Sequence, residues 1–261
     1  MAIYEDQFSE DLDLPQISAS PQIYMIASTP RCGSHFLGHI LIETGEFGVP
    51  FEYLNPGNLK IWRKRLQTDN KIETLQALIS RRTSANGWFG LKAHWSQFAP
   101  AQREGLLDPL PKIARIVFLY RSDLLSQAVS FAIAMQTGQW ISKTQADREA
   151  HYNYDKILKA GQALRNQNRK WWNFLLANPT PAMVLRYEDV LSERSSNISD
   201  LVSFLDPAVS PSSISLESVS TKRQGTSMNT EWKTRIRAEL RAGDDWILKS
   251  QYFDPAALLR Q

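Results

Sequence analysis

The pattern of apolar and polar positions divides the chain into alternating segments of two kinds. Short apolar runs predict strands at 22–28, 87–95, 114–123 and 182–191. The run at 114–123 does not alternate apolar and polar residues, which predicts a strand buried on both faces. Segments of helical spacing or helical composition are found at about 34–45, 72–79, 124–136, 145–176, 194–205 and 229–241. Strands that alternate with helices predict an α/β fold in three layers, with a central parallel sheet flanked by helices.

Two connecting regions are rich in turn-forming residues. The segment "FGVPFEYLNP" at 47–56 follows the first predicted helix and could place one or two side chains over the loop before that helix. A connection punctuated by prolines follows the second predicted strand.

Composition narrows the class of protein. The 261 residues are 43% hydrophobic and 22% charged, which is typical of globular proteins. We expect one domain over 21–261, preceded by an acidic, flexible or loosely docked arm over 1–20. A net charge of +3 is too small to indicate nucleic-acid binding, so the basic residues near the C-terminus point to a small anionic ligand.

The sequence also carries signals of location. No apolar run reaches the roughly eighteen residues of a membrane span, and the first residues are acidic rather than a basic leader. The single cysteine, Cys32, cannot form an internal disulfide, which suits a reducing compartment. We therefore expect a cytoplasmic protein without a membrane span.

The stretch "ASTPRCGSHF" at 27–36 lies between a predicted strand and a predicted helix. A helix N-terminus at the carboxyl end of a strand offers free backbone N–H groups to an anion. Gly33 lets the backbone wrap closely, Ser34 supplies a hydroxyl and Arg31 supplies a permanent cation. These features indicate a phosphate cradle, and the alternative is an ordinary turn capped by a serine.

The loop does not match that of nucleoside triphosphatases. The pattern GxxxxGK[ST] is absent, and the apolar strand "IVFLY" ends in Arg121 where a metal-holding aspartate would be expected. The sequence therefore indicates anion binding without a magnesium ion.

Three motifs, "STPRCGSH", "RSDLLSQAVS" and "KRQGTSMNTEW", follow one another along the chain. In this order they resemble the motifs of the PAPS-dependent sulfotransferases, which have a P-loop-like fold. The resemblance implies that a first loop binds the 5′-phosphosulfate of PAPS, through Ser28, Thr29, Pro30, Arg31, Cys32, Gly33, Ser34 and His35. A second motif, "RSDLLSQAVS", implies binding of the 3′-phosphate by Arg121 and Ser130. A third, "KRQGTSMNTEW", adds Arg223, Gln224 and Trp232 to the donor site.

The spacings are similar to those of one bacterial group within this superfamily. The nine-residue separation of Arg121 and Ser130, the block "GLKAHW" and the tail "RQ…EW" resemble the trehalose 2-sulfotransferase (Stf0-type) family over about residues 22–240. The resemblance implies transfer of a sulfuryl group from PAPS to a hydroxyl of a carbohydrate or glycolipid-like acceptor, with a general base and no metal. Two basic sites at neighbouring strand ends also suit a nucleoside with phosphates at both ends.

Each of these residues also has a structural interpretation. Arg121 can cap a helix together with Asp123. Lys222 and Arg223 can be two neighbouring solvated charges, and Trp232 can be a core residue. The thiol of Cys32 is interpreted as a packing group rather than a nucleophile.

Sulfuryl transfer to an alcohol needs a base near the attacking hydroxyl, and two candidates stand out. Glu52 in "VPFEYL" lies where the trehalose 2-sulfotransferase pattern has its proposed catalytic glutamate, and His94 in "LKAHW" resembles the histidine base of the cytosolic sulfotransferases. Histidine is intrinsically the better base, whereas Glu52 would need a pKa raised by burial. We place Glu52 slightly ahead because the family match is closer, and include Lys92 as a donor to the bridging oxygen or a holder of the substrate loop.

Other side chains suggest further roles. His35 and His39 have a spacing that suits a metal, but no third ligand is apparent, so no metal site is expected. An acceptor cleft could be lined by Trp62, Trp95 and Trp140, because the face of an indole ring suits the apolar face of a sugar. The pair at 171 and 172, "WW", marks a packing surface or the interface of a homodimer.

Two other functions compete with the sulfotransferase hypothesis. One is a catalytically silent nucleotide-binding sensor that keeps the donor pocket, and the other is a small-molecule kinase, which the missing lysine and aspartate oppose. The acceptor itself is not readable from the sequence, because the segments expected to contact it, about 53–86 and 136–165, are those that match the family pattern least.

Overall fold

A parallel sheet organises the computed structural model, which describes residues 5–16, 20–140, 147–210 and 227–260. Its strands follow the order β2-β1-β3-β4 and all pair in parallel. Their bounds are β1 Gln22–Ser28, β2 Trp88–His94, β3 Ile113–Tyr120 and β4 Ala182–Arg186. The α/β fold with a central parallel sheet is thereby confirmed.

Helices connect the strands and cover the sheet. The longer ones are α1 Ser34–Glu43, α2 Pro56–Leu66, α3 Lys71–Arg82, α4 Trp95–Arg103, α5 Leu124–Thr137, α6 Tyr154–Ala177, α7 Tyr187–Ser192, α8 Arg194–Leu205 and α9 Ser227–Ala238. Short 3₁₀ turns span Glu5–Phe8, Glu10–Leu12, Asp245–Leu248 and Pro255–Arg260. Of the described helices, none is long and apolar enough to cross a membrane.

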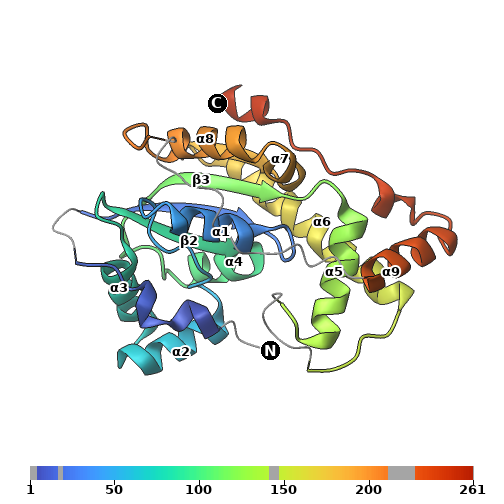
Figure 1. Ribbon diagram of the computed structural model, residues 1–261, viewed down its shortest axis with the longest axis horizontal. Helices are drawn as coiled ribbons and strands as arrows, with labels where there is room; N and C mark the ends of the chain where they lie inside the picture. Colours follow the sequence, from blue (N-terminus) through green and yellow to red (C-terminus); the bar gives the residue numbers. More distant parts are fainter. Residues whose placement is uncertain (1–4, 17–19, 141–146, 211–226, 261) are drawn as a thin grey trace.

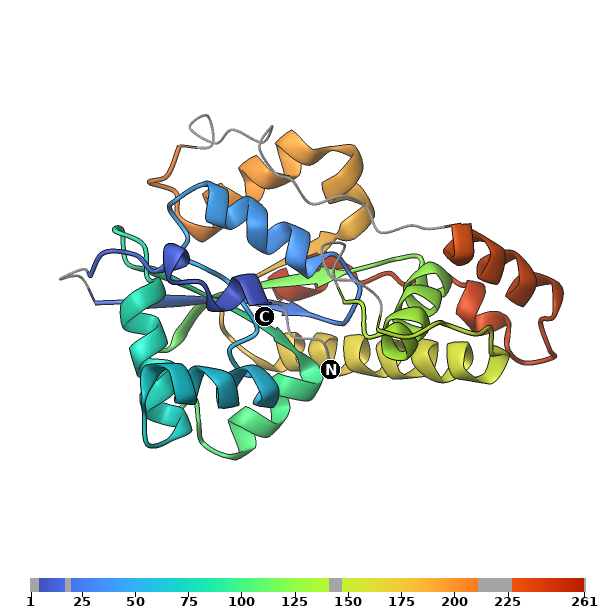
Figure 2. The same ribbon diagram turned by 60° about the horizontal axis from the view of Figure 1, so that its bottom comes forward.

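Alternate residues of each central strand supply two separate cores. In β1, Met25 and Ala27 face a core shared with α2, α3, α4 and α6, whereas Tyr24 and Ile26 face a core shared with α1 and α8. Figure 2 shows these two layers, with α1, α7 and α8 on one side of the sheet and α2, α3, α4 and α6 on the other. The three layers follow from burial of both faces of the sheet.

A third core lies beyond the edge of the sheet. It is built from α5, the first half of α6, α9 and the turn at Asp245–Leu248. In Figure 1, α5 and α9 lie next to one another at one end of the molecule, beside the start of α6.

The structure corrects several predicted boundaries. The strand predicted over 182–191 ends at Arg186, and α7 begins at Tyr187. The helix predicted from about 145 begins only at Tyr154, where the side chain of Asn153 accepts a hydrogen bond from the Lys156 N–H and caps it. The helix predicted over 229–241 ends at Ala238.

Two helices were not predicted at all. Helix α2 starts inside the turn-rich region, with Asn55 as the N-cap and Pro56 in the first turn. Helix α4 begins directly after β2 and contains Pro100, so the first part of the connection punctuated by prolines is helical. Pro56 and Pro100 therefore lie at the start of a helix and within a helix, whereas Pro109 and Pro111 follow α4 in non-helical chain.

The described part of the N-terminal segment is packed on the domain. Phe8 is 2% exposed and lies against Trp62, and its carbonyl oxygen accepts a hydrogen bond from Arg65 of α2 at 2.6 Å. Asp13 forms an ion pair with the buried Arg82 at 2.8 Å. These contacts join Phe8 and Asp13 to α2 and α3.

Candidate active site

The carboxyl ends of three neighbouring strands bring the predicted site residues to one edge of the sheet. β1 lies between β2 and β3, and Ser28 at its end pairs with His94 at the end of β2. Arg121 directly follows β3 on the other side. The loop after β1 therefore has Lys92 and His94 on one flank and Arg121 on the other.

The backbone of this loop is wound tightly. Arg31 and Gly33 have left-handed φ angles of 65° and 91°. A Cβ on Gly33 would lie only 2.3 Å from Cδ2 of Tyr187, the first residue of α7. Glycine is required here both by its backbone angle and by the close approach of the tyrosine ring.

Two buried side chains fix the loop in place. Gln127 of α5, which has no exposed surface, donates through Nε2 to Thr29 Oγ1 at 2.9 Å and to the Pro30 carbonyl oxygen at 2.7 Å. Trp171 of α6 donates through Nε1 to the Ser28 carbonyl oxygen at 2.8 Å. The loop is thus anchored to helices from both sides before any ligand binds.

Arg31 occupies the centre of the site. Its Nε donates to Ser130 Oγ at 2.9 Å, and its Nη1 donates to the Trp140 carbonyl oxygen. Burial, and then the nearby Arg121 guanidinium, lowers the pKa of Arg31 to about 10, so the group remains a cation at neutral pH. Two guanidinium groups that repel one another in a partly buried site favour an anion between them.

The guanidinium group of Arg121 makes fewer hydrogen bonds than it has donors in the described part of the structure. Its side chain is 16% exposed, lies over the Tyr187 ring at 5.3 Å, and has its Nε 3.9 Å from Glu188 Oε1. The Glu188 carboxylate makes its hydrogen bonds to the backbone N–H groups of Ser122 and Asp123 instead, at 3.1 and 3.2 Å. Arg121 Nε is consequently a buried donor with no hydrogen-bond acceptor in the part of the chain described here.

On the β2 flank, Glu52 is held by three side chains. Its Oε1 lies 3.1 Å from Lys92 Nζ and 3.5 Å from His94 Nε2, and its Oε2 accepts a hydrogen bond from Gln97 Nε2 at 2.7 Å. The Lys92 side chain is 5% exposed, that of His94 11%, and that of Glu52 23%. Of the three groups, the carboxylate is the one that is most open to a ligand.

The charge state of Glu52 follows from these neighbours. Burial raises the pKa of its carboxyl, but the Lys92 ammonium, His94 and the hydrogen bond from Gln97 outweigh burial and hold that pKa well below its usual range. Glu52 is therefore ionised at neutral pH. The raised pKa that would make Glu52 an efficient base is not found at this site.

His94 joins this cluster to the loop. Its Nδ1 lies 3.1 Å from Ser28 Oγ, while its Nε2 faces Glu52. Both ring nitrogens are directed at protein groups, which leaves the histidine less open to an acceptor hydroxyl than the carboxylate.

The remaining loop residues serve packing. Cys32 has no exposed surface, and burial raises the pKa of its thiol. Ser34 is buried at the first turn of α1. His35 and His39 lie with their Nε2 atoms 3.1 Å apart. Within the described ranges, no group of three or more His, Cys, Asp and Glu side chains is arranged to hold a metal ion.

The third motif is described only in part. Arg223 and Gln224 lie outside the described residues. Trp232 is 3% exposed and belongs to the third core, where its ring meets Tyr152 edge-on at 5.7 Å. The structure thus shows Trp232 as a packing residue of α9.

The tryptophans suggested as acceptor contacts are mostly core residues. Trp62 is 3% exposed, and Trp95 packs against Trp171 at 4.9 Å between ring centroids. Trp171 has no exposed surface, and the partly buried Trp172 packs on Phe253, so both rings contribute to the packing of α6. Among these residues, Trp140 has a direct contact with the loop, through its carbonyl oxygen.

Sequence reasoning missed Gln97, Gln127 and Tyr187. Gln127 is a long polar residue in the middle of a mostly apolar helical stretch, and that position could have marked it. Gln97 lies three residues after His94, which is the spacing of a helix-capping box, but the helix it caps was not predicted. Tyr187 left no local signal, because its contact with Gly33 depends on the pairing of β3 with β4.

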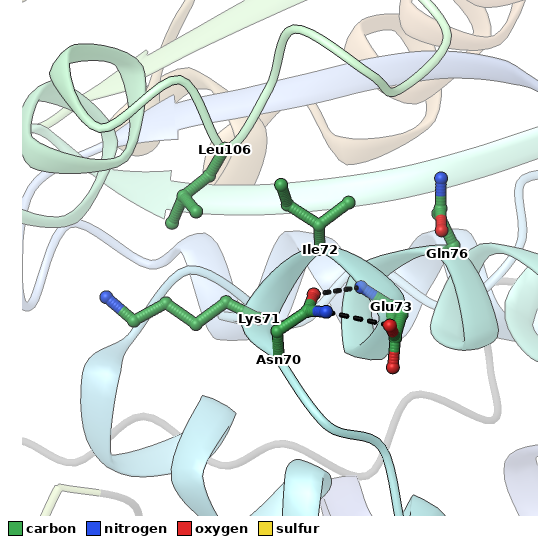
Figure 3. Close-up of a pocket in the computed structure, with 6 residues that line it drawn as sticks. All are labelled: Asn70, Lys71, Ile72, Glu73, Gln76 and Leu106. Atoms are coloured by element: carbon green, nitrogen blue, oxygen red, sulfur yellow. Dashed lines mark hydrogen bonds between the residues drawn. The ribbon is translucent and has the colours of Figure 1, made fainter.

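A surface cavity lies elsewhere. Figure 3 shows this cavity of about 460 Å³, lined by residues of the first turns of α3 and by Leu106. Asn70 caps α3 there through the Glu73 N–H at 3.0 Å. The cavity contains none of the site residues named above.

Comparisons with known proteins relate the sequence and the fold of this chain to sulfotransferases. The family model described as Stf0 sulphotransferase matches residues 23–239. The trehalose 2-sulfotransferases of Mycobacterium tuberculosis and Mycolicibacterium smegmatis are 24% and 22% identical to this chain, and each match covers 85% of this chain and 97% of the relative. Mouse sulfotransferase SULT7A1 complexed with PAP shares the fold, with a TM-score of 0.50 at 14% identity over 98% of this chain and 85% of that one.

Proposed function

Because the chain belongs to the Stf0 sulphotransferase family, we propose that it transfers a sulfuryl group from PAPS to a hydroxyl of a carbohydrate or glycolipid-like acceptor. PAPS carries a phosphosulfate at the 5′ position and a phosphate at the 3′ position of one nucleoside. The proposed donor site must therefore bind two anionic groups a nucleoside apart.

One observation carries the proposal: the cations Arg31 and Arg121 lie at the ends of adjacent strands, and Arg121 Nε is a buried donor that finds no acceptor among the described residues. Arg31 belongs to the tight loop that precedes α1, and Gly33, the N-cap residue of that helix, makes no side-chain cap hydrogen bond. We assign the 5′-phosphosulfate to this loop and the 3′-phosphate to Arg121. Ser130 of α5 accepts a hydrogen bond from Arg31 at 2.9 Å, and we assign it to the 3′-phosphate together with Arg121.

The acceptor is assigned to the opposite flank, beside Glu52. The loop separates Glu52, Lys92 and His94 on the β2 side from Arg121 on the β3 side, so an acceptor near Glu52 would approach the 5′ end of the donor. In-line transfer needs the attacking and leaving oxygens on opposite sides of sulfur. The two relatives named as trehalose 2-sulfotransferases favour a sugar acceptor.

In the proposed reaction, Glu52 accepts the proton of the acceptor hydroxyl while the hydroxyl oxygen bonds to sulfur. The bond between sulfur and the phosphate oxygen of the donor breaks, which gives a sulfate ester and adenosine 3′,5′-bisphosphate. A carboxylate of low pKa is a weak base, but the hydroxyl becomes strongly acidic once its oxygen has begun to bond to sulfur. Lys92 keeps Glu52 ionised, and Arg31 faces the charge that develops on the leaving phosphate.

Ligand-induced thermal stabilisation tests the donor half of this proposal. Adenosine 3′,5′-bisphosphate should raise the Tm in the absence of magnesium, because the proposed site uses arginines and backbone N–H groups instead of a metal. Adenosine 5′-monophosphate, which lacks the 3′-phosphate, should raise it less. Stabilisation only by ATP with magnesium would contradict the proposal and favour a kinase.

A further inference from the structure

We propose that Gln97 is a positioning residue that fixes the orientation of the Glu52 carboxylate for proton transfer. Its side-chain amide joins two parts of the site: Oε1 accepts the His94 backbone N–H at 3.0 Å, and Nε2 donates to Glu52 Oε2 at 2.7 Å. The kinetic consequence of this inference rests on the proposed function, whereas its structural consequence does not.

The orientation of the Gln97 amide is fixed by its partners. The His94 backbone N–H can only donate and an ionised carboxylate can only accept, so the amide oxygen faces His94 and the amide nitrogen faces Glu52. Gln97 is 8% exposed and is the third residue of α4. It is therefore held by the rigid start of a helix that begins directly at the end of β2.

This hydrogen bond makes the two Glu52 oxygens different. With Oε2 held by Gln97, Oε1 is the oxygen that faces Lys92 and His94. A half-turn of the carboxylate would only exchange two equivalent oxygens, whereas any smaller rotation would break the contact with Gln97, so this hydrogen bond fixes the plane of the carboxylate. The titratable and charged groups that face Glu52 are Lys92 and His94 of β2, and Gln97 adds a neutral donor from α4.

Gln97→Glu separates positioning from folding. Glutamate at this position keeps an oxygen for the His94 N–H and is a normal partner in a helix-capping box, so α4 can begin as before. It removes the donor to Glu52 and places a second carboxylate oxygen beside Oε2. Two neighbouring carboxylates resist joint ionisation, so the Glu52 pKa rises in this variant. Gln97→Met, which can make neither hydrogen bond, is a second variant with an uncharged side chain.

The matched control is Gln102→Glu. Gln102 is exposed on the same helix and has the same charge change without a contact to Glu52. Carbon-13 NMR follows the Glu52 carboxyl, which is assigned by its absence in Glu52→Gln. Steady-state assays with PAPS give kcat, the donor KM and the pH profile.

The inference predicts that Gln97→Glu raises the Glu52 pKa by about one unit or more. For the same variant it predicts a kcat about tenfold or more below that of wild type at pH 7 and a donor KM within about twofold of the wild-type value. The acid limb of the pH–rate profile should move to higher pH. Gln97→Met shifts the same quantities in the same direction, and Gln102→Glu leaves them unchanged.

A Glu52 titration in Gln97→Glu and Gln97→Met that matches wild type overturns the inference. If Gln97→Glu does not fold, Gln97→Met decides alone. If wild type transfers no sulfuryl group, the proposed function fails, while the NMR titration still decides whether Gln97 controls Glu52.

Discussion

Ser28 and His94 join the two halves of the site. They pair across the parallel strands β1 and β2, and Ser28 Oγ lies 3.1 Å from His94 Nδ1. The loop to which we assign the 5′-phosphosulfate follows Ser28, and His94 is next to Glu52 in the cluster assigned to the acceptor. The pairing of two strands therefore sets the distance between the donor site and the proposed base.

Replacement of Arg121 by alanine should weaken donor binding selectively. Within the ranges that the structure describes, Arg121 Nε is a buried donor without an acceptor, and a phosphate would accept its hydrogen bond. We expect adenosine 3′,5′-bisphosphate to bind at least tenfold more weakly, which corresponds to the loss of about 1.4 kcal/mol. Isothermal titration calorimetry measures this change.

The control for this experiment is Arg103→Ala. Arg103 is exposed in the last turn of α4 and has no role in the site. Equal affinities of Arg121→Ala and wild type for the bisphosphate would rule out the assigned 3′-phosphate site.

Gly33→Ala should abolish donor binding by two separate effects. The left-handed φ of 91° strains an alanine by about 1–2 kcal/mol, and its Cβ would also meet the Tyr187 ring at 2.3 Å. The Tm shift induced by adenosine 3′,5′-bisphosphate should disappear, because the loop must move to admit the methyl group.

Gly45→Ala separates the two effects. Gly45 also has a left-handed φ, of 72°, but a Cβ there meets nothing within 4 Å. This variant should lose some stability and keep the full ligand-induced shift. If both variants keep that shift, close packing of Tyr187 on Gly33 is not needed for binding.

The ion pair between Glu52 and Lys92 predicts a pH-dependent contribution to stability. The folded-state pKa of Glu52 is held below the value of about 4.3 in unfolded chains, so its stabilising effect is present above that pH and is lost as the pH falls through the folded-state value. Glu52→Gln should therefore reduce the free energy of unfolding more at pH 7 than at pH 3. The reduction at pH 7 should be on the order of 2 kcal/mol, because it leaves Lys92 buried without its carboxylate.

Urea denaturation at the two pH values measures this difference. The control is Glu104→Gln, since Glu104 forms an exposed ion pair with Lys71 that should contribute little at either pH. A Glu52→Gln effect of the same size at pH 3 and pH 7 would contradict a lowered Glu52 pKa.

The fold was largely predictable from the sequence because β1 and β3 are buried on both faces and read as continuous apolar runs. Loop residues such as Arg31 and Gly33 were also predictable, since a strand, a tight turn and a helix follow one another locally. Gln97 was not, because its role depends on Glu52, which reaches it from a segment 45 residues away. The prolines Pro56 and Pro100 concealed two helices, one as a favourable first-turn residue and one inside a helix that is packed on the core.

The assignment of the proton acceptor can be tested by comparing two substitutions. Glu52→Gln should lower kcat by about 10² or more with little change in donor affinity, because the amide cannot accept the proton. His94→Gln should lower it less, since its ring nitrogens contact Ser28 and Glu52. Single-turnover kinetics would show the difference, and the reverse order of effects would identify His94 as the base.

The measurement that tests the central claim most directly is transfer of ³⁵S from labelled PAPS to a panel of sugars and glycolipids, with chelator present to remove divalent metals. The account predicts labelled sulfate esters from wild type, and loss of the label in both Arg121→Ala and Glu52→Gln but not in Arg103→Ala. Transfer that is retained in Arg121→Ala and Glu52→Gln would show that the chemistry takes place elsewhere. Binding of adenosine 3′,5′-bisphosphate without transfer to any member of the panel would contradict the proposed carbohydrate sulfotransferase.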